Sequence, residues 1–202
     1  MKKQSARTAS AARTRNRLLS SAEDLFRSQG FHGTGLDQIL KRSRTPKGSL
    51  YHYFPGGKNE LAIATVRYTA ALMKQSMTAM LASNTESAAA LEAWIGNNAA
   101  MLSDSDFRNG CPLAAITLDI ASSQPAIREA CAQGFQILLD LLSEHLKVAG
   151  FSPARARALA TLVFASLEGA LILSRAQKSL EPLATIEHEL AMLIRSSIKA
   201  HA

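Results

Sequence analysis

The 202-residue sequence has only two cysteines, Cys111 and Cys131, and this scarcity excludes several kinds of site. The two are too few and too far apart for a zinc-site pattern, and we expect buried thiols without a structural disulfide. Uncharged apolar runs of eighteen or more residues are also missing, which argues against a membrane-spanning helix. The first residues, MKKQSARTASAARTRNR, lack the apolar segment of a signal peptide. We expect a cytoplasmic protein with no membrane partner.

Catalytic groupings are missing as well. We find no Ser/His/Asp or Cys/His arrangement, no paired carboxylates and no phosphate-binding loop. His145, His188 and His201 stand isolated on predicted helices. The sequence therefore predicts a protein that is not an enzyme and that has no metal site and no cofactor.

Acidic residues are scarce in the first part of the sequence. Residues 1–58 hold twelve Lys/Arg against three Asp/Glu, a net charge of +9, whereas residues 59–202 hold eleven against thirteen, a net charge of −2. This asymmetry predicts a polyanionic partner for the N-terminal part. A basic tail at residues 1–12 would follow a phosphate backbone without reading sequence, although the tail could also be a merely solvated terminus.

A short helix pattern follows Thr34. The apolar residues recur at helical spacing, and Asp37, three residues after Thr34, is placed to accept from free N–H groups at the helix start. These apolar residues are Leu36, Ile39 and Leu40. The pattern ends near Arg44, so we predict a short, capped helix.

A second short helix pattern follows almost immediately. Thr45 with Pro46 is a strong start signal and predicts a helix over about 46–53. Its inner face would consist of Leu50, Tyr53 and Phe54. Gly48 costs about 1 kcal/mol of helix propensity, which suggests that a ligand approaches the backbone there. Two short helices and a tight turn, with a basic and hydroxyl-rich outer face, form a helix-turn-helix hypothesis for DNA binding.

The amino-acid sequence of this stretch resembles the signature of the tetracycline-repressor (TetR) family of transcriptional regulators. The resemblance covers about the first 65 residues. Two positions depart from the family pattern: Gly35 stands where serine or threonine is usual, and Arg44 stands where glycine is usual. Arg44 would have to adopt a left-handed conformation, or the geometry of the turn would differ slightly. The matching residues are Gly30, Phe31, Thr34, Leu36, Ile39, Lys47, Gly48, Ser49, Leu50, Tyr51, Tyr53, Phe54, Lys58 and Leu61.

The resemblance implies double-stranded operator DNA as the partner. Lys47 and Tyr51 are the outward positions that we expect to reach DNA. We expect Thr34, His52 and Lys58 to hold phosphates and Thr45 to lie near the groove edge. The remaining members of the predicted DNA-binding set are Arg44, Gly48 and Ser49.

The helical pattern continues to the end of the chain, so the predicted class is all-α. We predict a basic flexible tail at 1–12, a helix-turn-helix domain at 13–57 whose first helix is 14–29, a connecting helix at 58–81, and a helical ligand-binding and dimerisation domain at 82–202. The helices predicted in that last domain are 88–102, 112–121, 125–149, 153–180 and 182–200.

The last two predicted helices offer more apolar surface than their domain can hide. The helix from Pro153 is apolar nearly all round, and Ala165 and Gly169 would let another helix come close. The final helix has one apolar stripe, formed by Ile186, Leu190, Leu193, Ile194 and Ile198. A homodimer through a four-helix bundle would cover this surface, as the family resemblance also implies. The alternative is that both are core helices of a monomer.

The resemblance further implies a small-molecule effector, whose identity the sequence does not give. The stretch DFRNGCPLAAITLDIA resembles a TetR subgroup whose members respond to drugs and planar aromatic compounds. Ligand binding would shift the connecting helix and release a repressor from an inverted-repeat operator, although activation stays open. The candidate lining residues are large and apolar with a few polar groups: Trp94, Asn98, Met101, Phe107, Ile116, Phe135, Leu139, Phe164 and Glu168.

A second hypothesis is a redox-sensing regulator switched through Cys111. This thiol lies just before a predicted helix start, where thiol pKa values are lowered. Arg108 is the basic residue near it in the sequence. An oxidant would then take the place of the effector.

Overall fold

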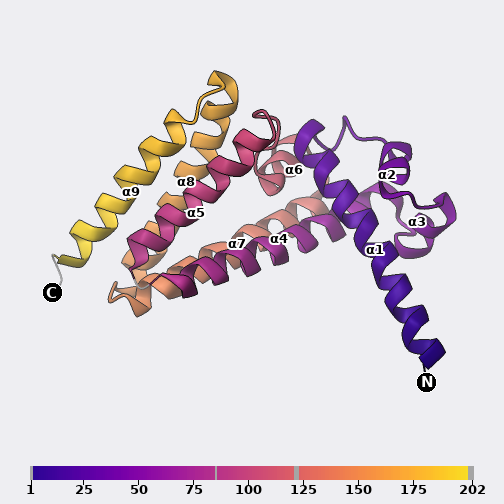
Figure 1. Cartoon of the computed structure of the whole chain (residues 1–202), viewed down its shortest axis with the longest axis horizontal. Helices are drawn as coiled ribbons and strands as arrows, with labels where there is room; N and C mark the ends of the chain where they lie inside the picture. Colours follow the sequence, from indigo (N-terminus) through magenta and orange to yellow (C-terminus); the bar gives the residue numbers. More distant parts are fainter. Residues whose placement is uncertain (1, 85, 121–122, 200–202) are drawn as a thin grey trace. The chain divides into compact units, whose positions relative to one another are not determined.

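The computed structural model describes residues 2–84, 86–120 and 123–199, and each regular element in these ranges is an α-helix (Figure 1). The predicted all-α class is confirmed. Apart from the start of the first helix, the predicted helix ends agree with the structure within three residues, and residues 121 and 200 lie outside the described part. The helices are α1 (Lys2–Gln29), α2 (Leu36–Ser43), α3 (Lys47–Tyr53), α4 (Gly57–Ser83), α5 (Ser87–Asp104), α6 (Pro112–Ile120), α7 (Pro125–Val148), α8 (Pro153–Gln177) and α9 (Glu181–Lys199).

The chain forms two compact units. The first comprises Met1–Thr69 with Pro112–Ala132, and the second comprises Ala70–Cys111 with Gln133–Ala202. Helices α4 and α7 contribute residues to both units. Helix α6 and the start of α7 therefore belong to the N-terminal unit, whereas the sequence pattern placed them in a single domain at 82–202. Helical periodicity identifies an apolar face but not the element that covers it.

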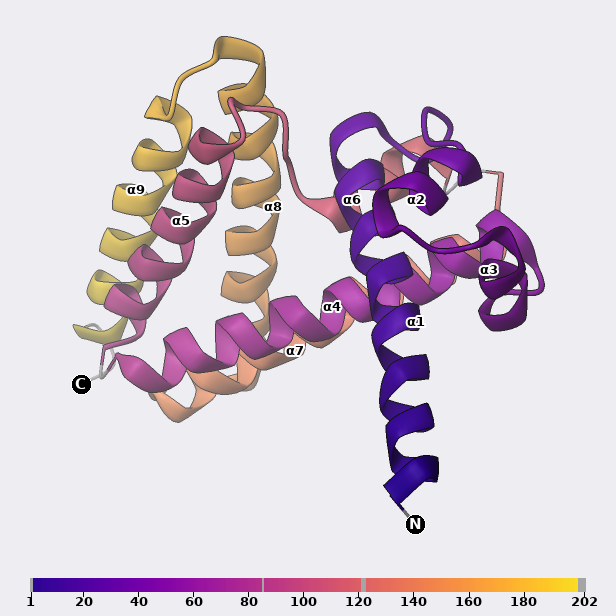
Figure 2. The same ribbon diagram turned by 45° about the vertical axis from the view of Figure 1, so that its right-hand side comes forward.

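The first unit is built on α1. Its apolar stripe, Leu18, Leu19, Ala22 and Phe26, is fully buried. The helix begins at Lys2 rather than at residue 14, so the expected flexible tail is helical, because residues 2–13 contain neither glycine nor proline to stop it. Helix α6 packs against α1 (Figure 2), and the Asp119 carboxylate on α6 accepts a hydrogen bond of 2.7 Å from the His32 backbone N–H after α1.

The second unit is a layer of packed helices in which α5, α8 and α9 lie side by side (Figures 1 and 2). The rings of Trp94 on α5 and Phe164 on α8 are 5.0 Å apart. Arg195 on α9 donates to Glu92 on α5 at 2.8 Å and to Glu86 just before it at 2.9 Å. These contacts fasten the last helix to the rest of the unit.

Helix α8 is long and apolar enough to cross a membrane by length and composition alone, although it contains no uncharged apolar run of eighteen residues. In the structure 44% of its most apolar window is buried within the protein. Core helices of soluble proteins meet the same two criteria, and α8 packs against α9 and α5. A single helix that meets these criteria is weak evidence for a membrane span.

Candidate nucleic-acid interface and effector region

Helix α3 presents the outer face that we predicted to contact DNA, and we call α3 the reader helix. Leu50 and Phe54 are buried in the first unit and hold the inner side of the helix. The outer side carries Lys47, Gly48, Tyr51 and His52, which are exposed, with Ser49 partly buried. A Cβ atom at Gly48 would meet nothing within 4 Å, so packing inside the protein does not require glycine there. The open space above Gly48 is available to a ligand.

The turn between α2 and α3 is a Schellman motif centred on Arg44. The N–H of Arg44 donates to Lys41 O at 3.3 Å, and the N–H of Thr45 donates to Leu40 O at 3.1 Å. Arg44 adopts φ 50° and ψ 45°, which confirms the left-handed conformation expected at this position. The arginine side chain is exposed beside the start of α3.

Two residues of the predicted DNA-contact set are buried. Thr34 is 1% exposed and donates its hydroxyl to Gly30 O at 2.7 Å, and Thr45 is 5% exposed and donates its hydroxyl to Ser43 O at 3.2 Å. Both hydroxyl groups are thus engaged within the protein, and their contacts with phosphate and with the groove edge stay a prediction. Short hydroxyl side chains in turns often bond to their own backbone, which here holds the ends of α1 and α2.

The helix starts also differ from the predicted caps. The residue before α2 is Gly35, whose N–H donates to the Gln38 side chain at 2.8 Å, so Gln38 rather than Asp37 supplies the capping oxygen. Helix α3 begins at Lys47, one residue later than predicted, and Pro46 rather than Thr45 precedes it. The sequence predicted where both helices start, but not which residues cap their N-termini.

Lys58 lies at the start of α4 and is only partly exposed. Its ammonium nitrogen is 4.2 Å from the centre of the Phe31 ring. Burial lowers the pKa of Lys58, and the carboxylate of Asp119 acts in the opposite direction. Nearby, the Gly56 N–H already donates to Glu60 at 2.7 Å. A phosphate contact by Lys58 would therefore exchange the ring contact for an anion.

The predicted effector residues are only partly brought together. Trp94 and Phe164 form a ring pair between α5 and α8, and Glu168 follows Phe164 by one turn. The Asn98 amide, expected to face the ligand, donates instead to Trp94 O at 2.8 Å. Ile116 belongs to the first unit, whereas Trp94, Phe164 and Glu168 belong to the second. Of the other members, Met101 is exposed, whereas Phe107, Phe135 and Leu139 are partly buried in the second unit.

A contact between Glu168 and Cys111 could not be predicted from the sequence. The Cys111 thiol and the Glu168 carboxyl share a hydrogen bond, and burial, the larger influence, raises the pKa of Glu168. Arg175, two turns further along α8, packs against Gly110, the residue before Cys111, while Arg108 donates to Ser105 O. Cys111 and Cys131 are both buried, and neither takes part in a disulfide within the described part of the chain.

The raised pKa of Glu168 makes stability depend on pH. Because its folded-state pKa lies above the unfolded value of 4.5, the folded state holds the proton between those two values. Its stabilising contribution is therefore complete below pH 4.5 and is lost as pH rises through the folded value. Glu168→Gln is expected to raise the melting temperature at pH 8, by about 2–4 °C for each kcal/mol of unfolding free energy gained, and to leave it unchanged at pH 4. Thermal melts at both pH values test this.

The exposed Glu189 provides the matched control, because Glu189→Gln removes the same charge from the surface of α9. An equal effect of both substitutions at pH 8 would show that burial of Glu168 is not the cause.

His145 is not isolated, contrary to its interpretation from the sequence. Its Nε2 lies 3.0 Å from the Ser87 hydroxyl, which joins α7 to the start of α5, and burial lowers the pKa of His145. Across residues 2–84, 86–120 and 123–199, no group of three or more His, Cys, Asp or Glu is arranged to hold a metal ion. The Ser87–His145 contact thus stands as a link between helices.

Two family models match the two parts of the chain. The model described as "Bacterial regulatory proteins, tetR family" matches residues 18–65, which include the helix-turn-helix. The model described as "Transcriptional regulator LmrA/YxaF-like, C-terminal domain" matches residues 87–189. Together they cover the reader helices and most of the second unit.

Similar proteins extend over nearly the whole chain. The uncharacterized HTH-type transcriptional regulator YxaF of Bacillus subtilis is 32% identical over 182 residues, covering 90% of this chain and 95% of YxaF. The HTH-type transcriptional regulator LmrA of the same organism is 34% identical over 170 residues, covering 84% and 90%. The crystal structure of reduced Escherichia coli NemR is 27% identical, with a TM-score of 0.76 over 88% of this chain and 94% of that one. The chain therefore belongs to the TetR family of DNA-binding transcriptional regulators.

Proposed function

We propose that this regulator is a homodimeric, cytoplasmic repressor that binds an inverted-repeat operator through α3 and leaves it when a small aromatic or hydrophobic effector binds. The observation that carries the DNA-binding role is the outer face of α3, where Lys47, Tyr51 and His52 are exposed around an unobstructed Gly48. Arg44 adds a cation at the preceding turn. In helix-turn-helix proteins this helix enters the major groove with its N-terminal residues at the base edges.

An apolar groove along α8 and α9 supports the homodimer. It has a volume of about 500 Å³, and Leu173, Ala170 and Ile186 are among its lining residues. A Cβ atom at Gly169 in this groove would meet nothing within 4 Å, which leaves room for the backbone of a second helix. The buried residues of α9, including Leu190 and Ile194, instead face the interior of their own unit, and the side chain of Ile198 lies outside the described residues. The groove is thus the surface that we assign to the partner subunit.

The effector proposal depends on the Trp94–Phe164 ring pair and on Glu168. Two aromatic rings with a partly buried carboxyl one turn away suit a planar, largely apolar molecule that also offers a polar group. Helix α4 runs from the helix-turn-helix into the second unit and gives a continuous connection between reader and effector. Because the coupling is reciprocal, operator DNA should weaken effector binding by the factor by which the effector weakens DNA binding.

Selection from a random duplex library tests the proposed DNA-binding function. The purified protein is expected to enrich an inverted repeat whose half-sites are one helical turn apart, about 10–10.5 base pairs, or a multiple of it. Enrichment of a single half-site without its inverted copy would contradict the dimeric arrangement. Failure to enrich any sequence would contradict sequence-specific binding.

A redox switch at Cys111 is the second candidate. Arg175 lies against the neighbouring Gly110, and a cation near a thiol favours the reactive thiolate, although the Glu168 carboxylate opposes it. If this switch operates, hydrogen peroxide should release the protein from its selected operator, and Cys111→Ser should remain bound. Cys131→Ser is the matched control. Equal release of the wild type and Cys111→Ser by peroxide would reject the thiol mechanism.

A further inference from the structure

We propose that Arg44 determines operator specificity and that its guanidinium group binds the major-groove edge of one guanine in each half-site. This inference rests on the DNA binding proposed above and adds a base contact that the outer face of α3 lacks. Arg44 lies in the turn between α2 and α3, and its side chain is exposed. The ligand of this residue is thus a purine edge with two neighbouring acceptors, O6 and N7.

Helix α3 has few groups that can distinguish one base pair from another. Direct readout in the major groove depends on side chains that make two hydrogen bonds to one base, as arginine does with guanine and as asparagine or glutamine does with adenine. The sequence of α3, KGSLYHY, contains no arginine, asparagine or glutamine. Lys47 carries a point charge, and Tyr51 and His52 offer single polar atoms, so none of the three presents two parallel donors.

The side chain of Arg44 is available for such a contact. Arg42, two residues earlier, donates from Nε and Nη2 to Oδ2 of Asp24 at 3.1 and 2.6 Å, so its guanidinium is already engaged. Across residues 2–84, 86–120 and 123–199, the guanidinium of Arg44 has no hydrogen bond or ion pair. Arg44 therefore presents an unoccupied planar fork of N–H donors, which matches O6 and N7 of guanine.

The backbone of Arg44 indicates that arginine is held here at a cost. Arg44 follows α2 with φ 50° and ψ 45°, a left-handed conformation in which glycine is the usual residue because a Cβ atom is unfavourable there. Lys41 and Lys47 are exposed cations on helical backbone and could neutralise phosphates without this cost. The contact that offsets the strain at Arg44 is therefore one that these lysines do not supply.

Arg44 is close enough to the N-terminus of α3 to share its groove. Three positions along the chain separate Arg44 from Lys47, so their Cα atoms are at most about 11 Å apart. In helix-turn-helix proteins the N-terminal residues of the second helix lie at the base edges. Successive nucleotides of one strand rise about 3.4 Å along the duplex axis, so the guanine should lie within about three base pairs of the bases nearest to Lys47.

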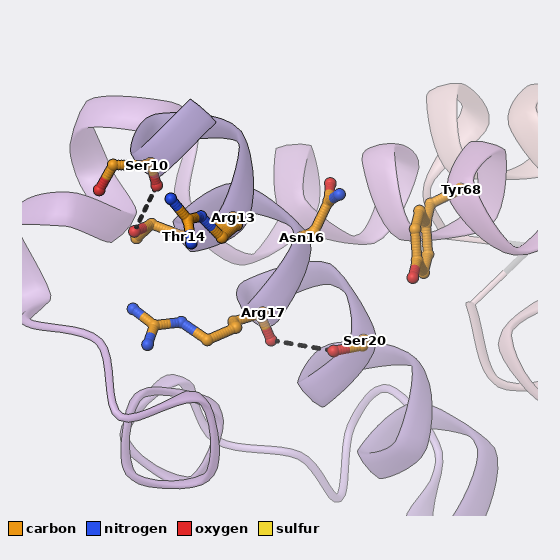
Figure 3. Close-up of a pocket in the computed structure, with 7 residues that line it drawn as sticks. All are labelled: Ser10, Arg13, Thr14, Asn16, Arg17, Ser20 and Tyr68. Atoms are coloured by element: carbon orange, nitrogen blue, oxygen red, sulfur yellow. Dashed lines mark hydrogen bonds between the residues drawn. The ribbon is translucent and has the colours of Figure 1, made fainter. Parts of the chain in front are cut away.

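The arginines at the start of the described chain do not take this position. The guanidinium carbon of Arg15 lies 5.6 Å from the centre of the Phe54 ring, at the C-terminal end of α3, whereas Arg44 precedes the N-terminal end. Arg13 and Arg17 line a cleft whose described lining residues come from α1 and α4 (Figure 3). Arg44 is therefore the arginine that we assign to the bases at the start of α3.

The test compares Arg44→Gly with Lys178→Gly. Both positions hold an exposed basic residue that ends a helix in the left-handed conformation, with φ values of 50° and 49°. Glycine adopts this conformation without a Cβ conflict, so both variants should fold, which circular dichroism checks. Lys178 lies in the second unit at the end of α8, so its substitution removes a cation and relieves the same backbone strain without changing the helix-turn-helix.

Selection from a random duplex library should give the wild type and Lys178→Gly the same inverted repeat, with a guanine in each half-site that Arg44→Gly no longer selects. Anisotropy titration then compares this operator with a duplex in which A·T replaces that G·C pair in one half-site. The wild type and Lys178→Gly should lose affinity by about 5- to 150-fold, and Arg44→Gly by less than about twofold, because its base contact is already absent.

Several results would overturn the proposal. One is an Arg44→Gly protein that selects the same bases as the wild type but binds every duplex more weakly, with a log-affinity against log-salt slope flatter by about 0.9 for each protomer, which would assign Arg44 to a phosphate. Another is a position that depends on Arg44 but holds a base other than guanine. An equal change of selectivity in Lys178→Gly would likewise exclude a direct base contact.

The same selection separates this proposal from the proposed function. If the wild type enriches an inverted repeat and the assignment of Arg44 fails, the proposed repressor still stands. If the wild type enriches no sequence, the proposed function and the guanine contact fail together.

Discussion

Leu173→Arg is expected to convert the proposed dimer into monomers and to abolish operator binding at nanomolar protein. Leu173 is 52% exposed in the chain and lines the apolar groove of α8 and α9. A two-fold interface presents the same substitution twice, so two unpaired guanidinium groups would be buried. Leaving a charge buried without a partner costs about 3–5 kcal/mol, and two such charges would weaken dimerisation by a factor above roughly 10⁴.

Val148→Arg is the matched control for this substitution. Val148 is 89% exposed at the end of α7 and is not part of the groove, so it gains the same charge without entering the interface. Sedimentation equilibrium over a concentration series would report the oligomeric state of both variants, and circular dichroism would report their folding. A Leu173→Arg protein that is folded and still dimeric at micromolar concentration would exclude the groove as the interface.

Tyr51→Ala is expected to cause the largest loss of operator affinity among the reader substitutions. The side chain is 43% exposed on α3, so its removal should leave the fold intact while deleting a contact with DNA. A side chain that contacts a base typically contributes about 1–3 kcal/mol, and two protomers give roughly 2–6 kcal/mol for the complex. Anisotropy titration of the selected operator and of a scrambled duplex should show the loss on the operator alone.

Lys47→Ala should behave differently from Tyr51→Ala. If Lys47 contacts only phosphate, its loss should lower affinity for every duplex and flatten the salt slope by about 1 for each protomer. Lys74→Ala is the control, because Lys74 is an exposed cation of α4 in the second unit. An unchanged slope for Lys47→Ala would remove Lys47 from the phosphate contacts.

Much of the reader could be predicted because its signals are local. A proline restricts the residue before it, an apolar residue recurs at helical spacing, and the position of Arg44 demanded a left-handed turn that the structure contains. Leu50 and Phe54 are buried as the pattern required. Local signals did not predict the internal hydrogen bonds of Thr34 and Thr45, because a hydroxyl group in a turn bonds either to its own backbone or to a ligand, and the sequence is the same in both cases.

The second unit was harder to predict because its important contacts join distant residues. Glu168 meets Cys111 and Ser87 meets His145 across 57 and 58 positions, and no spacing rule connects either pair. Only the folded chain reveals these pairings.

The central claim is that effector binding controls sequence-specific DNA binding. Its most direct test is a titration of the wild-type protein against DNA from upstream of its own gene at two salt concentrations, followed by planar aromatic compounds added to the bound complex. We predict tight, salt-sensitive binding to an inverted repeat, and release by one of the compounds while a scrambled duplex stays unbound throughout. Binding that no compound disturbs but that peroxide reverses would contradict effector control and point to Cys111. Equal affinity for operator and scrambled DNA would contradict sequence-specific DNA binding itself.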